Sequence, residues 1–261
     1  MRRFAALSVA LVAVLALAAV AFAARTNQYN VTGSVSPTKS GTKKKPAAVS
    51  VKFDYTISEA SSQRPSPVKR YKILIDGVNV NSKLWPACTA ARINAAQSDQ
   101  SCPKGSLVGT GSITAVAGNE ANPNDKSINC YLSLKVYNAG NNRAALFLTG
   151  SPSQSLPPEK RCATSFSAAI AANYVRSARG TTLQFDVPEV PFRSQVNGTI
   201  EVSTIKTQST IKRLTRTVKG RKVGYYETVG GCRAGKRAIT VTFLNEDNQT
   251  AQGQATSKCS K

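Results

Sequence analysis

The sequence predicts an all-β fold, which we expect to be an antiparallel β-sandwich of the immunoglobulin-like or jelly-roll-like kind, stapled by disulfides. Three observations support this prediction. Apolar residues alternate with polar ones in about a dozen short runs, and turn-forming residues separate these runs. Beyond the apolar segment at the N-terminus, a single stretch has the composition of a helix. Many short strands joined by turns are typical of sandwiches and barrels.

The strongest alternation lies in residues 49–57, where Val51, Phe53 and Tyr55 fall on every second position. Because successive side chains of a strand point to opposite faces, this run predicts a half-buried strand. Residues 128–136 alternate in the same way and place Cys130 on the apolar side. Further strand-like runs occupy residues 29–35, 68–75, 107–116, 144–148, 183–187, 199–205, 210–218, 223–229, 238–244 and 250–257.

One short helix is predicted over residues 89–96, with Thr89 as its N-cap. Residues 245–248, Asn-Glu-Asp-Asn, predict the turn of a hairpin, and residues 219–222 predict a second hairpin loop. No interior segment has the composition of a linker between domains. We therefore expect residues 24–261 to form a single β-sandwich domain.

The first residues have the pattern of an export signal. Arg2 and Arg3 precede an apolar segment, residues 5–20, and Ala21 and Ala23 supply the small residues of a cleavage site. This pattern predicts a signal peptide over residues 1–23, cleaved after Ala23, and a protein that is secreted or held in the cell envelope. An uncleaved membrane anchor is the alternative, because residues 4–24 carry no charge.

The cysteines support export. All six lie beyond the signal segment, and an even number in an exported chain predicts disulfides, although sequence alone allows many pairings. We favour pairing in chain order, because each bond then closes a modest loop. With no Cys-x-x-Cys motif and no histidine, we expect no metal site and no cofactor. The expected pairs are Cys88–Cys102, Cys130–Cys162 and Cys232–Cys259.

Charge is the second strong feature. The formal net charge is +22, and loss of Arg2 and Arg3 with the signal peptide lowers it only slightly. Such a chain attracts anionic cell-wall or surface polymers, although the excess charge could serve solubility alone. A basic loop, residues 36–46, and a basic hairpin, residues 206–229, are the candidate binding segments. The basic residues of the hairpin are Lys206, Lys212, Arg213, Arg216, Lys219, Arg221 and Lys222.

Nucleic acid is not an expected partner, because the chain is exported and the basic tract lacks interleaved aromatic residues for base stacking. Trp85, the single tryptophan, is expected to cover the first disulfide, and an exposed sugar-stacking role is the alternative. The oxygen-rich cluster Glu120, Asn122, Asn124 and Asp125 lacks the fuller calcium-loop motif and predicts a polar turn.

Catalysis is not expected. Without histidine the chain has no Ser-His-Asp or Cys-His arrangement. Asp186 and Glu189 are the best carboxylate pair for the alternative, a glycan-processing hydrolase. A serine-lysine dyad and a structural or adhesive module with a protein partner are further alternatives. The leading hypothesis remains a non-catalytic protein that binds anionic surface polymer.

Residues 85–93 and 102–111 carry a resemblance. The pattern aromatic-Pro-x-Cys followed by Cys-Pro-x-Gly-Ser-x-Val-Gly-x-Gly resembles that of a group of exported actinobacterial β-sandwich proteins without an established function. The run from Tyr225 through Cys232 to Cys259 is similar to their C-terminal hairpin. The resemblance spans most of the mature chain and implies a shared topology and cysteine pairing. It implies no activity, so no catalytic residue is carried over.

Overall fold

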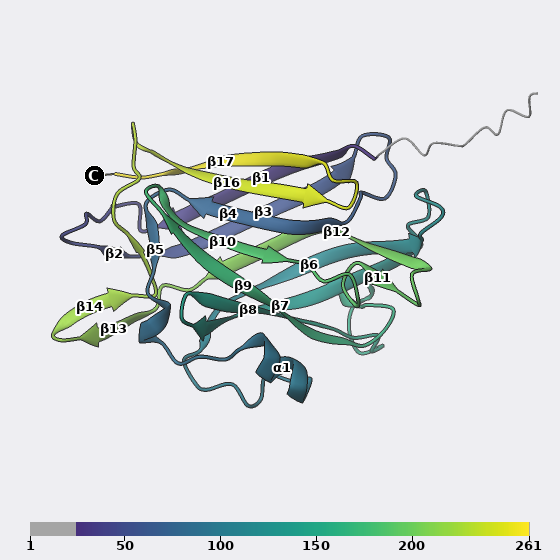
Figure 1. The fold of residues 1–261 in the computed structure, drawn as a ribbon, viewed down its shortest axis with the longest axis horizontal. Helices are drawn as coiled ribbons and strands as arrows, with labels where there is room; N and C mark the ends of the chain where they lie inside the picture. Colours follow the sequence, from purple (N-terminus) through teal and green to yellow (C-terminus); the bar gives the residue numbers. More distant parts are fainter. Residues whose placement is uncertain (1–24, 261) are drawn as a thin grey trace, which may run out of the picture.

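The structure is a computed structural model that describes residues 25–260 (Figure 1). The expected signal peptide, residues 1–23, and its cleavage after Ala23 lie outside the described residues. The described chain is all-β apart from one short α-helix and two 3-10 turns, as the sequence predicts. Its strands are β1 Asn27–Ser36, β2 Ala47–Ala48, β3 Ser50–Glu59, β4 Val68–Ile75, β5 Val78–Val80, β6 Leu107–Asn119, β7 Ile128–Gly140, β8 Arg143–Gly150, β9 Phe166–Ser177, β10 Gly180–Asp186, β11 Ser194–Gln195, β12 Ile200–Ile211, β13 Thr215–Val218, β14 Arg221–Gly224, β15 Tyr226–Thr228, β16 Lys236–Asn245 and β17 Thr250–Lys258.

The main sheet is a nearly closed 11-strand antiparallel barrel, so the predicted β-sandwich is wrong at the level of architecture. Hydrogen-bonded neighbours follow one path, β1-β3-β12-β6-β7-β8-β9-β10-β4-β16-β17, and β11 adds to β12 beside it. A sandwich would divide these strands between two sheets. Here the path is unbroken, and its two end strands, β1 and β17, lie side by side (Figure 1).

The barrel interior is the main hydrophobic core. Strand β3 confirms the strongest sequence alternation, since Val51, Phe53 and Tyr55 are all buried, whereas Lys52 between them is exposed. Aromatic rings from several strands pack together in this core. The ring of Phe243 stacks on that of Tyr29 with centroids 4.1 Å apart and meets the ring of Tyr55 edge-on. Such pairs stabilise a core beyond the area that they bury.

A second, three-stranded sheet, β2-β15-β5, lies across one end of the barrel. It contributes Tyr226 to the core, and the neighbouring Tyr225 is fully buried. Trp85 packs edge-to-face on Tyr225 with ring centroids 5.4 Å apart. The ring of Trp85 thus packs against the main core, whereas Cys88 belongs to a separate cluster outside the barrel. Trp85 therefore packs in the core, but against Tyr225 and not against the first disulfide, the neighbour that the sequence predicts.

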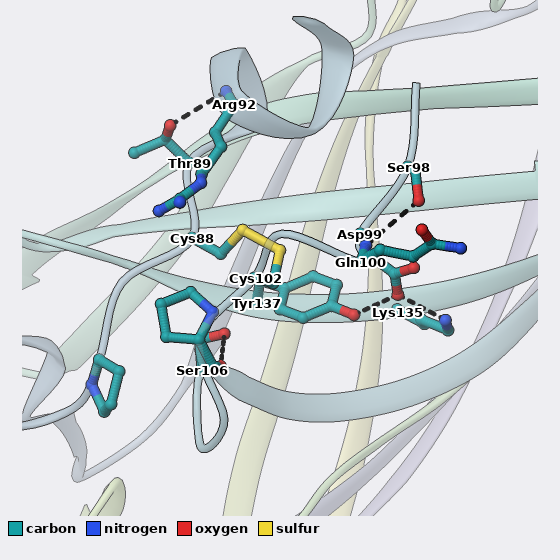
Figure 2. Close-up of a disulfide and its surroundings, with 12 residues drawn as sticks. Cys88, Thr89, Arg92, Ser98, Asp99, Gln100, Cys102, Ser106, Lys135 and Tyr137 are labelled. Carbon is teal, nitrogen blue, oxygen red and sulfur yellow. Dashed lines mark hydrogen bonds and ion pairs between the residues drawn. A yellow bond between two sulfur atoms is a disulfide. The ribbon is translucent and has the colours of Figure 1, made fainter. Parts of the chain in front are cut away.

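The predicted helix is present as α1, Ala90–Ala96, and it packs against β8 and β9 on the outside of the barrel. Thr89 caps it, because its Oγ1 accepts a hydrogen bond of 3.2 Å from the backbone N–H of Arg92 (Figure 2). Ile93 is fully buried in a small cluster that includes Cys88. Figure 2 shows the disulfide from Cys88 to Cys102 beside this cluster.

Asp99 fastens the segment after α1 to β7. Its carboxylate accepts hydrogen bonds from the ammonium of Lys135 and the hydroxyl of Tyr137 (Figure 2). Partial burial raises the pKa of Asp99, but these hydrogen bonds outweigh it and hold the pKa below its usual value. The charged carboxylate is therefore part of the native contact between the segment and the sheet.

The structure contains three disulfides, Cys88–Cys102, Cys130–Cys162 and Cys232–Cys259, and they join the cysteines in chain order. Three disulfides indicate that the chain folds in an oxidising, extracellular environment. Cys130 lies on the inward-facing side of β7 with Leu132 and Leu134, as its alternation predicts. From Arg25 to Ser260, no helix is both long and apolar enough to cross a membrane.

A buried arginine organises the other end of the barrel. The side chain of Arg64 is fully buried, and its Nε donates to the carboxylate of Glu201 over 2.9 Å. Its remaining nitrogens donate to the backbone carbonyls of Asn119, Asn122 and Asp125. The guanidinium therefore joins the connection after β3 to the connection after β6 and to β12. A buried charge with this many partners is costly to disturb.

Removing the first disulfide tests how α1 is held. We expect Cys88→Ala with Cys102→Ala to lower the free energy of unfolding by about 3 kcal/mol, because a loop of this length constrains the unfolded chain by about that amount. Urea unfolding followed by circular dichroism measures the change. An unchanged midpoint would show that the cluster around Ile93 holds α1 without the covalent bond.

Replacing Arg64 tests whether this buried arginine stabilises the end of the barrel opposite the three-stranded sheet. We expect Arg64→Ala to lower the free energy of unfolding by about 3–5 kcal/mol, because several backbone carbonyls lose their donor and the carboxylate of Glu201 is left with Arg25 as its ion-pair partner. Lys160→Ala is the control, since Lys160 is exposed at the same end and its loss should change stability by less than about 0.5 kcal/mol. Equal effects in the two variants would refute the role of Arg64.

Candidate functional site

Two basic segments that are far apart in the sequence meet at one end of the barrel. Residues 37–46 connect β1 to β2, and β14 runs beside β2, where Gly224 contacts Ala48 so closely that a Cβ would not fit. Figure 1 shows this connection and the β13–β14 hairpin projecting from the same end of the molecule. We call residues 37–46 and 212–224 the basic end.

The β13–β14 hairpin is shorter than the loop predicted from the sequence. Val218 pairs with Arg221, so the turn consists of Lys219 and Gly220 alone, both with positive φ. Two-residue turns of this kind match the right-handed twist of paired strands. Arg221 and Lys222 therefore belong to β14 and not to the turn. All the basic side chains of the hairpin are exposed.

Arg216 fixes the hairpin to the body of the protein. Its guanidinium lies 5.9 Å from the centre of the Trp85 ring and donates a hydrogen bond to the backbone carbonyl of Leu84. A guanidinium over an aromatic face is attracted by the electrons of the ring. Arg216 thus serves as an anchor, and within residues 25–260 none of the other basic side chains of the hairpin forms an ion pair with a carboxylate.

The structure brings most of the predicted binding residues together. Lys212 and Arg213 follow β12 directly and are exposed at the foot of the hairpin. Lys206 does not join them, because it lies within β12 opposite Thr56 and Thr114, on the outer face of the barrel. Position in the strand separates Lys206 from the hairpin, a distinction that a count of charges along the chain could not make.

The loop contributes Lys43, Lys44 and Lys45, which are all exposed. The loop is tied down at its base, because the backbone N–H of Gly41 donates to the hydroxyl of Thr228 over 3.0 Å. Sequence reasoning missed Lys83, which is exposed in the 3-10 turn Ser82–Leu84 beside the anchor of Arg216. The position of Lys83 two residues before Trp85 was the one feature of the sequence that could have pointed to it.

Acidic groups near the basic end are already paired. The carboxylate of Asp76 pairs with Arg179, and that of Glu227 is buried and accepts hydrogen bonds from Asn81 and the backbone N–H of Gly224. The other acidic residues lie on β3 (Asp54), beside α1 (Asp99), or at the opposite end of the barrel (Glu59, Glu120, Asp125, Glu159, Asp186, Glu189, Glu201, Glu246 and Asp247). The positive charge of the basic end is therefore not offset locally.

The carboxylate pair Asp186 and Glu189 is exposed, and the carboxylate of Asp186 forms an ion pair with Arg70. Neither residue lines the interior hollow of the barrel. In the oxygen-rich loop, both carboxylate oxygens of Asp125 accept backbone N–H groups, from Asn119 and Ser127. These hydrogen bonds lower the pKa of Asp125 to about 2. The cluster forms the polar turn that the sequence predicts.

Within residues 25–260, no three or more His, Cys, Asp or Glu side chains are grouped so that they could hold a metal ion. Comparison with protein-family models, with curated proteins and with solved structures finds no match. The resemblance of residues 85–93 and 102–111 to exported actinobacterial proteins therefore stays an expectation. The candidate site rests on the geometry and charge of the basic end.

Proposed function

We propose that this protein is an exported, non-catalytic protein whose basic end binds an anionic polymer of the cell wall or cell surface. The observation that carries the proposal is the meeting of two basic segments, residues 37–46 and 212–224, at one end of the barrel. They are separated by more than half of the chain, so their juxtaposition is a product of the fold.

The basic end suits a flexible, repeating anion. Its charges lie on a hairpin and a loop that project from the body of the protein (Figure 1). Arginine offers paired N–H donors to a phosphate, and lysine adds point charge. Arg213 and Arg221 can offer paired N–H donors to a phosphate, and the exposed lysines of the basic end add positive charge. A phosphate-rich wall polymer, such as a teichoic acid, matches this chemistry.

Charge removal at the basic end tests the proposal. We expect Lys44→Gln, Lys219→Gln and Lys222→Gln together to weaken binding to purified teichoic acid about a hundredfold, at about 1 kcal/mol for each basic residue near an anionic surface. Binding of the unsubstituted protein should also weaken steeply between low and high salt. Titration calorimetry at two salt concentrations measures both effects.

The matched control removes the same charge elsewhere. Lys72, Lys126 and Lys160 are exposed on β4 and in two connections at the opposite end of the barrel, and their replacement by Gln leaves the same net charge as the test variant. We expect this control to bind nearly as well as the unsubstituted protein. If both triple variants lose affinity equally, net charge and not the basic end governs binding, and the proposal fails.

A further inference from the structure

The interior of the barrel contains a hollow of about 140 Å³. Protein interiors are normally packed as densely as organic crystals, and an apolar cavity of about 150 Å³ is large enough to bind a benzene molecule. The wall consists almost entirely of aliphatic and aromatic side chains from β3, β4, β6, β7, β8, β9, β10 and β12. The strands thus enclose an apolar space that their own side chains do not fill.

Several inward-facing side chains confirm the unfilled space. Ile73, Ile113, Leu183 and Phe185 all line the hollow, yet each is only half-buried. Their neighbours on the same strand faces, such as Ile75, are buried. An inward-facing apolar side chain that retains accessible surface lacks packing partners on one side and loses the dispersion contacts that they would provide.

The hollow is long and narrow. On β4 it is lined from Val68 to Ile75, a distance of about 20 Å for an extended strand. Val80 and Tyr226 line it at the basic end, where the three-stranded sheet crosses the barrel. A small volume spread over this length suits an unbranched hydrocarbon chain better than a fused ring system.

One charged residue lines the hollow. Arg193 lies at the end opposite the three-stranded sheet, in the connection between β10 and β11, with its side chain 13% exposed. Its Nε donates to the backbone carbonyl of Val187 over 2.9 Å, and its guanidinium pairs with Glu246, which is more exposed. Burial lowers the pKa of Arg193. The hollow is thus mostly apolar, with the hydroxyl-bearing side chains of Thr204, Thr207 and Ser209 in its wall, and cationic at one end.

We propose that this hollow binds a single-chain carboxylate amphiphile, such as a fatty acid, with its hydrocarbon chain along the barrel axis and its carboxylate on Arg193. The chain would bury against Ile73, Ile113 and Leu183, which now retain accessible surface. The carboxylate would take the planar donors of the guanidinium that Glu246 now occupies, and Glu246 would turn to solvent. This ligand is independent of the polymer proposed for the basic end.

Filling the hollow provides the test. Val202 lines the hollow, and its backbone N–H donates to the carbonyl of Arg193, whereas Val175 on β9 points outward and is 45% exposed. We expect the mature protein to bind dodecanoate at one site per molecule in titration calorimetry. Val202→Phe should weaken binding at least tenfold, and Val175→Phe should leave it unchanged. Ile113→Phe, a smaller change in the same wall, should reproduce the loss if Val202→Phe does not fold.

Two further measurements test whether the carboxylate of the ligand binds to Arg193. Methyl dodecanoate has the same chain without the charge and should bind at least tenfold more weakly than dodecanoate, because a charged hydrogen bond is lost. Arg193→Gln should remove this difference. Absence of binding, equal binding to Val202→Phe and Val175→Phe, or equal affinity for acid and ester would each overturn the proposal. The polymer assay at the basic end is unaffected by these variants, so the two proposals can fail separately.

Discussion

The closure of a sheet with an odd number of strands is the constraint on which this structure depends. Eleven antiparallel strands leave the first and the last running in the same direction, so β1 and β17 cannot complete an antiparallel ladder. A parallel bridge between Lys39 and Ser260 and a hydrogen bond from the backbone N–H of Val35 to the hydroxyl of Ser257 join them instead. At Gly253 a Cβ would overlap Val31, so glycine permits the close approach.

The junction of β1 and β17 closes the sheet and so defines the interior and the two ends of the barrel. Once β1 and β17 meet, the apolar faces of all the strands point toward one axis, and every connection falls at one of two ends. The end near Arg64 gathers most of the acidic residues, and the other gathers the basic loop and hairpin. The disulfide Cys232–Cys259 lies next to the bridge at Ser260 and holds the last strand there. Strand direction thus decides at which end each charged connection lies.

Most elements of this fold could be predicted from the sequence, but β9, Phe166–Ser177, was missed, and the closure of the sheet could not be predicted. Alternation located β3 and β7, and the helix after Thr89 followed from composition and capping. A sandwich and a barrel share the same alternation, because each strand has one buried face in both, and the choice depends on which strands pair. Arg64 follows Ser and Gln in a connection with no periodic pattern, so no local signal predicts its burial.

The basic segments were visible in the sequence as charge runs, but their meeting depends on the pairing of β2 with β15. Their charge has a further consequence. The chain has no histidine, and all six cysteines are in disulfides, so the side chains that ordinarily titrate near neutral pH are missing. The basic end keeps the same charge in mildly acidic and mildly alkaline surroundings. Release of the polymer that we propose for this end would therefore depend on ions or a competing polyanion and not on acidification of the medium.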